Sequence, residues 1–526
     1  MRVNIVGAGL AGLSAALTLA KDGVECNLFS IQQSERAQSV MAEGGINAVL
    51  DTMDEGDKIE YHFQDTMNGG ANLADPNAVD GLCSNAPAIV RELETLGVPF
   101  GKNDKGIVQR SFGGQKKKRT AFVKSSTGKM LMTALIDAVR QYEAQGLVYR
   151  YPHHCLEGLL LRDNECSGVL ISDEFTGDVY EFYGPVILAT GGMNGLFEGM
   201  TTGTTLNTSD ATAIALESGV ELANLEFIQY HPTTIAIQGK RLLISEAARG
   251  EGGRLYVMRK GYKWFFMEEK YPELKNLMPR DVVSAEMVRV VSLAECDNQV
   301  FLDMTEIPAF IWQSRLSDLR EQCVNYLNMD PVQTPIPVSP GIHYFMGGIR
   351  VDERHRTSLS NLYAAGECAC QYHGANRLGG NSLLGAIYGG RVAAQAVLEF
   401  ADRDALYRRN ALEDVPAHKV SPAVSARVTA ILSNSLQIIR HEATIDNSLK
   451  EIKMMLSDID NPAERRRLRL AQAVLLSAKY RRESRGAHKR KDYPEKDDVN
   501  FHKQTVVKRN GDELEISFCE IPERRT

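Results

Sequence analysis

The sequence predicts an α/β fold, in which a Rossmann-like nucleotide-binding domain is interrupted by an inserted domain and followed by helices. Three short apolar segments, at 3–6, 185–190 and 361–365, each run into glycines, as buried parallel strands do where they approach a ligand. These segments are far apart in the chain, so other structure must be inserted between them. From about residue 420 the apolar periodicity becomes helical.

The first of these segments leads into Gly7-Ala8-Gly9-Leu10-Ala11-Gly12, and a segment rich in Ala and Leu follows up to Lys21. This G-x-G-x-x-G pattern lies between a predicted strand and a predicted helix, which is the context that a dinucleotide site requires. The glycines permit a tight turn, and the helix N-terminus favours a pyrophosphate. The alternative is a glycine-rich turn that binds nothing.

The second predicted strand, at 24–30, ends at Ser30. In the usual NAD fingerprint an Asp or Glu at this place binds the ribose. A serine has a hydroxyl group but no charge, which weakens an NAD interpretation and leaves FAD open.

Composition excludes several classes of protein. The 526 residues are 43% hydrophobic and 24% charged, and the net charge of −7 gives no reason to expect a nucleic-acid or membrane-surface partner. No apolar run approaches the roughly 18 residues that span a bilayer. The first strand starts directly after Met1, which leaves no room for a signal peptide and predicts a cytoplasmic protein. The nine cysteines show no spacing typical of zinc, haem or an iron–sulfur cluster, so no metal site is expected.

Between these landmarks the pattern predicts individual elements. Helices are expected from Asp75-Pro76 to Leu96, over 127–145 and over 381–401, with short strands filling 147–183. Further helices are expected at 423–440 and 463–485. The charged runs at 465–467 and 488–491 are interpreted as solvated faces, with docking of a partner protein as the alternative.

Polar residues gather in glycine-marked loops at 229–281, 343–348 and 373–377. Each residue alone has an ordinary explanation, such as a capped loop histidine or an arginine in a turn. Together these loops offer three arginines and two histidines to a site beside a flavin. A dicarboxylate needs such a set, because guanidinium groups pair with carboxylates and imidazoles fix their orientation.

With these motifs in order, the chain resembles the flavoprotein subunits of succinate dehydrogenase and fumarate reductase, and the related L-aspartate oxidases. The resemblance covers nearly the whole chain. The shared motifs are G-A-G-L-A-G at 7–12, A-E-G-G at 42–45, F-G-G at 112–114, Q-Y-H-P-T at 229–233, R-G-E-G-G at 249–253, P-R-D at 279–281, H-Y-F-M-G-G at 343–348, G-E-C-A at 366–369, H-G-A-N-R-L-G at 373–379 and E-S-R-G-A-H at 483–488.

The resemblance implies an FAD-binding domain at 1–224 and 341–405, interrupted by an α+β capping domain at 225–340. A C-terminal helical domain at 406–505 and a tail at 506–526 complete the chain. The residues that it implies for FAD binding are Gly7, Ala8, Gly9 and Gly12 at the pyrophosphate, Ser30 near the ribose, Ser39, Gly44 and Gly45 near the flavin, Glu367 at the ribitol or ribose, and Asp210, Ser382 and Leu383.

The same resemblance assigns the reaction site. His231, Ser245, His343 and Arg377 match the residues that bind the dicarboxylate. Arg280 matches the proton donor to the double bond, and Glu246 and Arg249 match its proton relay.

Two positions depart from the family pattern. Gln38 stands where most membrane-bound members have a histidine joined covalently to the flavin, so we expect FAD to be bound non-covalently. Phe112 stands where aspartate oxidases have a glutamate that faces the amino group of the substrate.

We therefore expect reduction of fumarate to succinate, with the reverse reaction, that of a succinate dehydrogenase, as an alternative direction. A separate iron–sulfur subunit is the expected partner, and a membrane anchor is a further candidate. Attachment to the inner face of the membrane through such partners is an alternative to a purely cytoplasmic location. The rival functions are an L-aspartate oxidase, a reductase of another enoate, and an electron-transfer subunit whose active site has decayed.

Overall fold

The computed structural model describes residues 1–124, 126–401, 407–412 and 419–525. The predicted domain boundary between 405 and 406 lies outside these residues.

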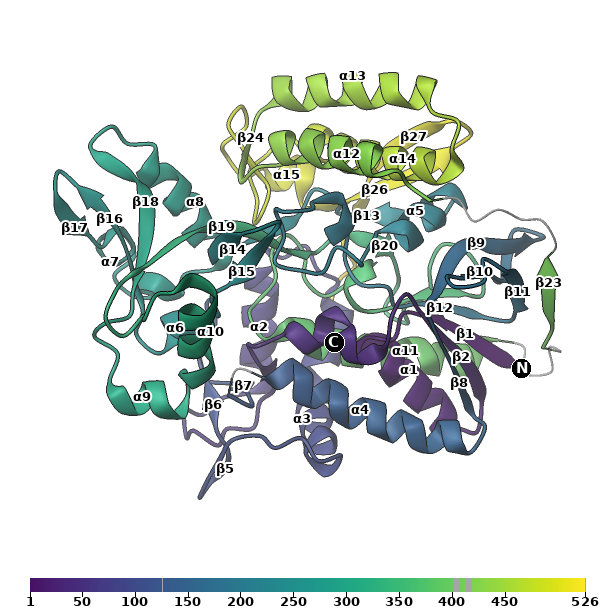
Figure 1. Ribbon diagram of the computed structural model, residues 1–526, viewed down its shortest axis with the longest axis horizontal. Helices are drawn as coiled ribbons and strands as arrows, with labels where there is room; N and C mark the ends of the chain where they lie inside the picture. The colour runs from purple at the N-terminus through teal and green to yellow at the C-terminus, as the bar shows by residue number, and fades with distance from the viewer. Residues whose placement is uncertain (125, 402–406, 413–418, 526) are drawn as a thin grey trace.

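A five-stranded parallel sheet lies at the right of Figure 1, near the N-terminus. Its strands, in spatial order, are β21 (Leu362–Ala364), β12 (Val186–Leu188), β1 (Arg2–Val6), β2 (Glu25–Ser30) and β8 (Val148–Pro152). All four neighbouring pairs are parallel. The three glycine-ended segments of the sequence are therefore β1, β12 and β21, adjacent in one sheet, and their carboxyl ends meet at one edge. The Rossmann-like α/β prediction is confirmed.

Helices cover one face of this sheet. They are α1 (Leu10–Lys21), α4 (Thr127–Ala144) and α11 (Asn381–Phe400), with α3 (Pro76–Thr95) and α2 (Ile59–Gly69) packed outside α11. Helix α3 begins as predicted, because the Asp75 side chain accepts the N–H of Asn77 at 2.9 Å with Pro76 in the first position. The predicted helices at 127–145 and 381–401 are confirmed by α4 and α11.

An antiparallel sheet packs against the other face of the parallel sheet. It consists of β9 (His154–Arg162), β10 (Glu165–Asp173), β11 (Val179–Tyr183) and β23 (Arg409–Leu412), so the predicted strands of 147–183 are confirmed. Phe182 of β11 contacts Phe29 of β2 with ring centroids 4.7 Å apart, and both side chains are fully buried. Smaller elements nearby are β3 (Ile46–Asn47), β4 (Lys102–Asn103), β5 (Gly106–Ile107), β6 (Gln109–Arg110), β7 (Thr120–Ala121) and α5 (Asp210–Glu217).

A second body, at the left of Figure 1, is built on a six-stranded antiparallel sheet. Its strands, in spatial order, are β15 (Lys240–Leu243), β14 (Ile228–Ile237), β19 (Ile336–Phe345), β18 (Cys296–Asp303), β16 (Arg254–Arg259) and β17 (Tyr262–Trp264). Its helices are α6 (Ala247–Gly250), α7 (Phe266–Lys270), α8 (Arg280–Val291), α9 (Ala309–Ser314) and α10 (Ser317–Leu327). Strand β19 joins the two bodies, since Phe345 lies in the core beneath the parallel sheet and Val338 in the core of the second body.

A helical layer lies at the top of Figure 1 and comprises α12 (Pro422–Ser435), α13 (Glu442–Asp458) and α14 (Pro462–Tyr480). Beside it lie α15 (Asp498–Phe501), β24 (Ile439–Arg440), β25 (Lys489–Arg490) and a sheet of β22 (Ala369–Cys370), β20 (Gly348–Arg350), β13 (Leu222–Ala223), β26 (Lys503–Asn510) and β27 (Glu513–Glu520). The segment 506–526, predicted as a C-terminal tail, therefore includes most of a β-hairpin that pairs with β13.

The interpretation of the charged runs as solvated faces is wrong for Arg467, His488 and Arg490. These side chains are at most 7% exposed. Each of them has at least one partner distant in the sequence, as when Arg467 Nη1 donates to Ser425 Oγ at 2.6 Å. A buried guanidinium is tolerated only with such partners.

The helices of the described residues include no candidate for a membrane span. None combines the length and the apolar character that crossing a bilayer requires.

Candidate active site

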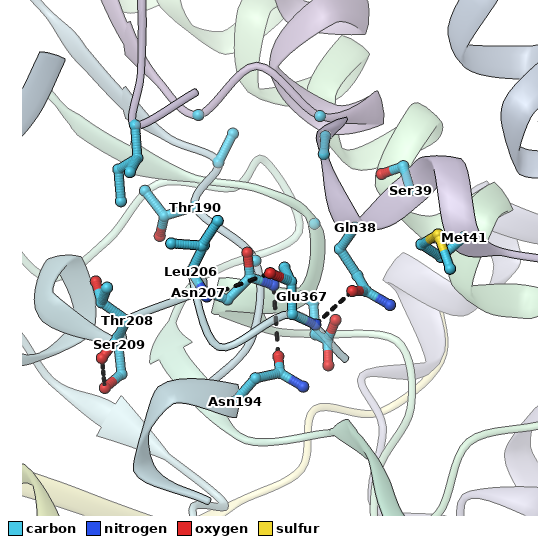
Figure 2. Close-up of a pocket in the computed structure, with 18 of the residues that line it drawn as sticks. Gln38, Ser39, Met41, Thr190, Asn194, Leu206, Asn207, Thr208, Ser209 and Glu367 are labelled. Atoms are coloured by element: carbon cyan, nitrogen blue, oxygen red, sulfur yellow. Dashed lines mark hydrogen bonds between the residues drawn. The ribbon is translucent and has the colours of Figure 1, made fainter. Parts of the chain in front are cut away.

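One cavity of about 660 Å³ extends from the glycine turn after β1 to the second body. Its volume is in the range of small-molecule and cofactor sites. Of the residues predicted to bind FAD, those that line it are Gly7, Ala8, Gly9, Ser30, Ser39, Gly44, Gly45, Asp210, Glu367, Ser382 and Leu383. Figure 2 shows how several side chains of this wall, including Ser39, Thr190 and Glu367, surround the space.

Gly12 does not line the cavity but shapes the turn beside it. A Cβ at Gly12 would lie 1.8 Å from the carbonyl oxygen of Gly7, and one at Gly7 would lie 2.1 Å from that of Ala189. Gly7 also has a φ of 111°, which side chains disfavour. The N-cap of α1, Gly9, supplies no side-chain acceptor, so the positive end of this helix is available to an anion. These features fit the pyrophosphate of FAD.

Glu367 lies deep in the cavity wall. One oxygen of its carboxylate accepts the N–H of Phe345 at 3.1 Å, and burial raises the pKa of the group to about 7. The Ser30 hydroxyl donates to the Gln32 carbonyl at 2.7 Å. Both residues offer polar groups for the sugar portions of a dinucleotide.

Gln38 joins two segments of the cavity wall. It begins the short 3₁₀ turn Gln38–Met41, and its side-chain oxygen accepts the backbone N–H of Thr204 at 2.6 Å (Figure 2). The loop 201–209 is thereby held against the turn Gln38–Met41.

Arg280 and Glu246 form a buried ion pair at the end of the cavity formed by the second body. Arg280 is the first residue of α8, and its Nε and Nη2 both donate to Glu246 Oε2, at 3.0 and 2.5 Å. The two side chains are 7% and 2% exposed. Two donors on one edge of the guanidinium thus converge on a single carboxylate oxygen, which fixes the direction of that edge.

Arg249 approaches the same carboxylate from the other side. Its Nη2 lies 3.2 Å from Glu246 Oε1, and its Nη1 donates to the carbonyl of Asn276 at 2.6 Å. Burial acts to raise the pKa of Glu246, but the charges of Arg280 and Arg249 and the N–H of Gly113 outweigh it and hold the pKa at about 2. Arg249, Glu246 and Arg280 therefore form a continuous run of buried charged groups, in which Glu246 is hydrogen-bonded to Arg280 and in ion-pair contact with Arg249.

Gln229 connects this chain to Arg377. Its side-chain oxygen accepts from Arg280 Nη1 at 3.0 Å and from Arg377 Nη2 at 3.2 Å. The Arg377 guanidinium also lies 4.3 Å from the centre of the Tyr344 ring. Burial, together with the charge of Arg280, lowers the pKa of Arg377 to about 9.

Two histidines complete the cationic pocket. His231 of β14 and His343 of β19 lie edge to face, with ring centroids 5.1 Å apart. Burial and then the charge of Arg280 lower both pKa values well below the usual range, so both rings are neutral at pH 7. The hydroxyl of Thr202 lies 2.8 Å from His343 Nδ1.

The structure thus brings the predicted reaction-site residues together. Ser245 and Phe112 also line the cavity, and both are nearly fully buried. Arg249 lies behind Glu246 rather than on the cavity lining. Sequence reasoning gave no role to Gln229 or Thr202. Gln229 lies within the Q-Y-H-P-T motif, two residues before the predicted site residue His231, which is a usable signal, whereas no motif contains Thr202.

Comparison with known proteins places the chain among flavoproteins. Residues 2–383 match the FAD binding domain family, and residues 463–524 match the family described as fumarate reductase flavoprotein C-term. The succinate dehydrogenase flavoprotein subunit of Bacillus subtilis is 35% identical over 99% of this chain and 95% of its own length.

Two further relatives bear on the reaction. The L-aspartate oxidase of Streptomyces coelicolor is 32% identical over 99% of this chain and 94% of its own length. A solved structure of a variant of E. coli quinol fumarate reductase FrdA superposes with a TM-score of 0.86 and 28% identity, covering 99% of this chain and 97% of that chain.

Proposed function

This chain belongs to the succinate dehydrogenase and fumarate reductase flavoprotein family, as an FAD-dependent oxidoreductase that acts on a CH–CH group, and we propose that it reduces fumarate to succinate. The observation that carries the proposal is the charged chain Arg249–Glu246–Arg280 at a cavity that also presents Arg377. The cavity offers cationic groups for two carboxylates, and the charged chain offers a path along which one proton can reach the substrate.

Binding of the substrate falls to the cations and the neutral histidines. Arg377 pairs with a carboxylate, and His231 and His343 donate to carboxylate oxygens without adding charge. A buried cationic pocket also stabilises the enolate-like charge that develops on the substrate during reduction. Bound FAD supplies the hydride that adds to one alkene carbon.

Arg280 delivers the proton to the other alkene carbon, so one π bond is lost and two C–H bonds form. A guanidinium is a weak acid, so Arg280 can donate a proton only if it is reprotonated immediately. Glu246 hydrogen-bonds Arg280 through one oxygen and lies beside Arg249 through the other, so the proton can be replaced along this chain.

The direction of the reaction follows from Gln38. In this family the covalent histidyl link accompanies a raised flavin potential, which assists succinate oxidation. A glutamine amide is not a nucleophile that could form this bond. The flavin should therefore be more reducing, which favours fumarate reduction.

Non-covalent attachment of FAD is tested by acid precipitation of the purified protein. Because Gln38 cannot form a bond to the flavin, we expect all yellow colour in the supernatant. Absorbance of the two fractions measures this directly, and flavin that stays with the denatured pellet would show a covalent link at another residue.

L-Aspartate should not be a substrate. Phe112 is 2% exposed and offers no carboxylate to an ammonium group, and a buried unpaired charge costs several kcal/mol. We expect oxidation of L-aspartate, followed as hydrogen peroxide release in air, to be negligible beside fumarate reduction by the same preparation. Comparable rates would make L-aspartate oxidase the better assignment. Reduction of another enoate would use the same residues Arg249, Glu246 and Arg280. An assay of reduced viologen dye against a panel of enoates distinguishes that function from fumarate reduction.

We further propose that a separate iron–sulfur subunit delivers the electrons, and that any attachment to the membrane is through partners. Support comes from the relatives, which are described as subunits of succinate dehydrogenase and fumarate reductase. Decay of the active site is disfavoured, because a non-catalytic flavin carrier has no need of a buried Arg–Glu–Arg chain.

A further inference from the structure

A neutral histidine can bind a carboxylate only if the ring nitrogen that carries the proton faces it. A neutral imidazole has one N–H donor and one bare nitrogen acceptor. Only the N–H can bind a carboxylate oxygen, and the bare nitrogen repels it. The nitrogen that carries the proton is set by the hydrogen bond at the other nitrogen.

His231 shows one solution. Its Nδ1 accepts the backbone N–H of Thr233 at 3.3 Å. A backbone amide can only donate, so the proton of His231 must be on Nε2. Within the described residues, no protein group is hydrogen-bonded to Nε2 of His231 or of His343, and both histidines line the cavity.

His343 has a side-chain hydroxyl in the corresponding place. Thr202 Oγ1 lies 2.8 Å from His343 Nδ1 and makes no other hydrogen bond in the described part of the chain. A hydroxyl can donate or accept, so the direction of this hydrogen bond depends on which nitrogen of His343 carries the proton. If Thr202 donates, Nε2 of His343 carries the proton and can bind a carboxylate.

The backbone holds Thr202 firmly in this position. The N–H of Thr202 donates to the carbonyl of Ile342 at 2.9 Å, and the N–H of Ile342 donates to the carbonyl of Met200 at 3.0 Å. Ile342 immediately precedes His343 on β19. The next residues of the loop are tied by the bond from the Thr204 N–H to Gln38.

From this arrangement we propose that Thr202 is a positioning residue for substrate binding: its hydroxyl donates to His343 Nδ1 and so presents Nε2–H to a substrate carboxylate. This inference rests on the proposed function, since it concerns a dicarboxylate in the same cavity. It adds a residue that touches the histidine rather than the substrate.

The test compares Thr202→Val with Thr202→Ser in FAD-loaded protein. Valine has the shape of threonine without the hydroxyl, and serine keeps the hydroxyl. We expect Thr202→Val to raise the KM for fumarate by about 10- to 100-fold, the range for one hydrogen bond to a charged group. The carboxylates are charged before and during the reaction, so kcat should change much less.

A second readout needs no turnover. Malonate is a dicarboxylate that cannot be reduced, and its binding can be followed through the absorbance of the bound flavin. Its Kd should rise with Thr202→Val by a similar factor and return to within about threefold of the parent with Thr202→Ser. Thr205→Val is the matched control, because it makes the same change at an exposed position of the same loop.

The outcomes separate this inference from the proposed function. If the parent protein does not reduce fumarate, the proposed function fails. If the parent is active and Thr202→Val changes neither the KM nor the malonate Kd more than twofold, the positioning role of Thr202 is overturned. A serine variant as impaired as the valine variant would overturn it equally. Should Thr202→Val lose FAD, Thr202→Ala takes its place with the same criteria.

Discussion

Replacement of Arg280 by lysine should lower the rate of fumarate reduction by about 10³-fold while FAD remains bound, since proton transfer by a positioned group contributes about 10²–10⁴-fold. The guanidinium makes three directed contacts, two to Glu246 and one to Gln229. An ammonium group is a single point charge and cannot reproduce this geometry. The charge of the pocket is retained, so the loss isolates the directed proton donor.

Arg289→Lys provides the control for this variant. Arg289 lies on the same helix α8, pairs with Glu286 at 2.7 Å and is 40% exposed, so the same chemical change there should leave the rate unaffected. The measurement is kcat for fumarate with FAD content determined from the visible spectrum. A rate for Arg280→Lys within tenfold of the parent would move the proton donor to another residue.

Glu246→Gln should cause the second large loss, about 10²- to 10⁴-fold in kcat. Glutamine keeps the size of the side chain but cannot carry a proton between Arg249 and Arg280. It also leaves two buried guanidinium groups without a counter-charge, and breaking a buried pair costs about 3–5 kcal/mol of stability. We therefore expect a lower melting temperature together with the kinetic defect.

The pH dependence follows from the pKa of Glu246, which is held at about 2 against an ordinary value of 4.5. A lowered folded-state pKa contributes stability that is fully present above the unfolded value and is lost as the pH falls through about 2. The loss of folding stability caused by Glu246→Gln should therefore be the same at every pH from 5 to 8. Glu268→Gln is the control, because Glu268 forms a bidentate pair with Arg254 that is partly exposed. A variant at Glu246 with parental kcat would exclude it from the relay.

The sequence predicts the nucleotide-binding half of this molecule well because its signals are local. A glycine turn between a strand and a helix is encoded in adjacent residues, and the cap at Asp75 lies next to the helix that it begins. Strand ends that run into glycines are recognisable without knowledge of the sheet. The parallel arrangement of β1, β12 and β21 then follows from the rules of α/β folds.

The sequence predicts the C-terminal region less well because many of its interactions are between residues distant in the sequence. Arg481 is fully buried and pairs with Glu226, which lies on a different part of the chain, and with Glu483. A run of arginines followed by a basic cluster has the composition of a solvated face, and only the fold supplies the buried carboxylates. The hairpin β26–β27 was missed for the same reason, since its partner β13 is remote.

The same distinction between local and distant signals applies to the residues of the active site. The charged residues of the reaction site lie in motifs that a family resemblance identifies. The residues that orient them, Gln229 and Thr202, are small or neutral and have no pattern of their own. Their importance is visible only as distances, such as the 3.0 and 3.2 Å bonds by which Gln229 links Arg280 and Arg377.

We expect this isolated chain to reduce fumarate when it receives single electrons. The most direct measurement is an anaerobic assay in which reduced viologen dye is oxidised in the presence of fumarate, other enoates or L-aspartate, with NADH as an alternative donor. We expect rapid dye oxidation with fumarate and much slower oxidation with other enoates. We expect no reaction with NADH, because the glycine turn that would bind a nicotinamide dinucleotide is assigned to FAD. A preparation loaded with FAD that oxidises the dye with another enoate but not with fumarate would show that fumarate is not the substrate of this site.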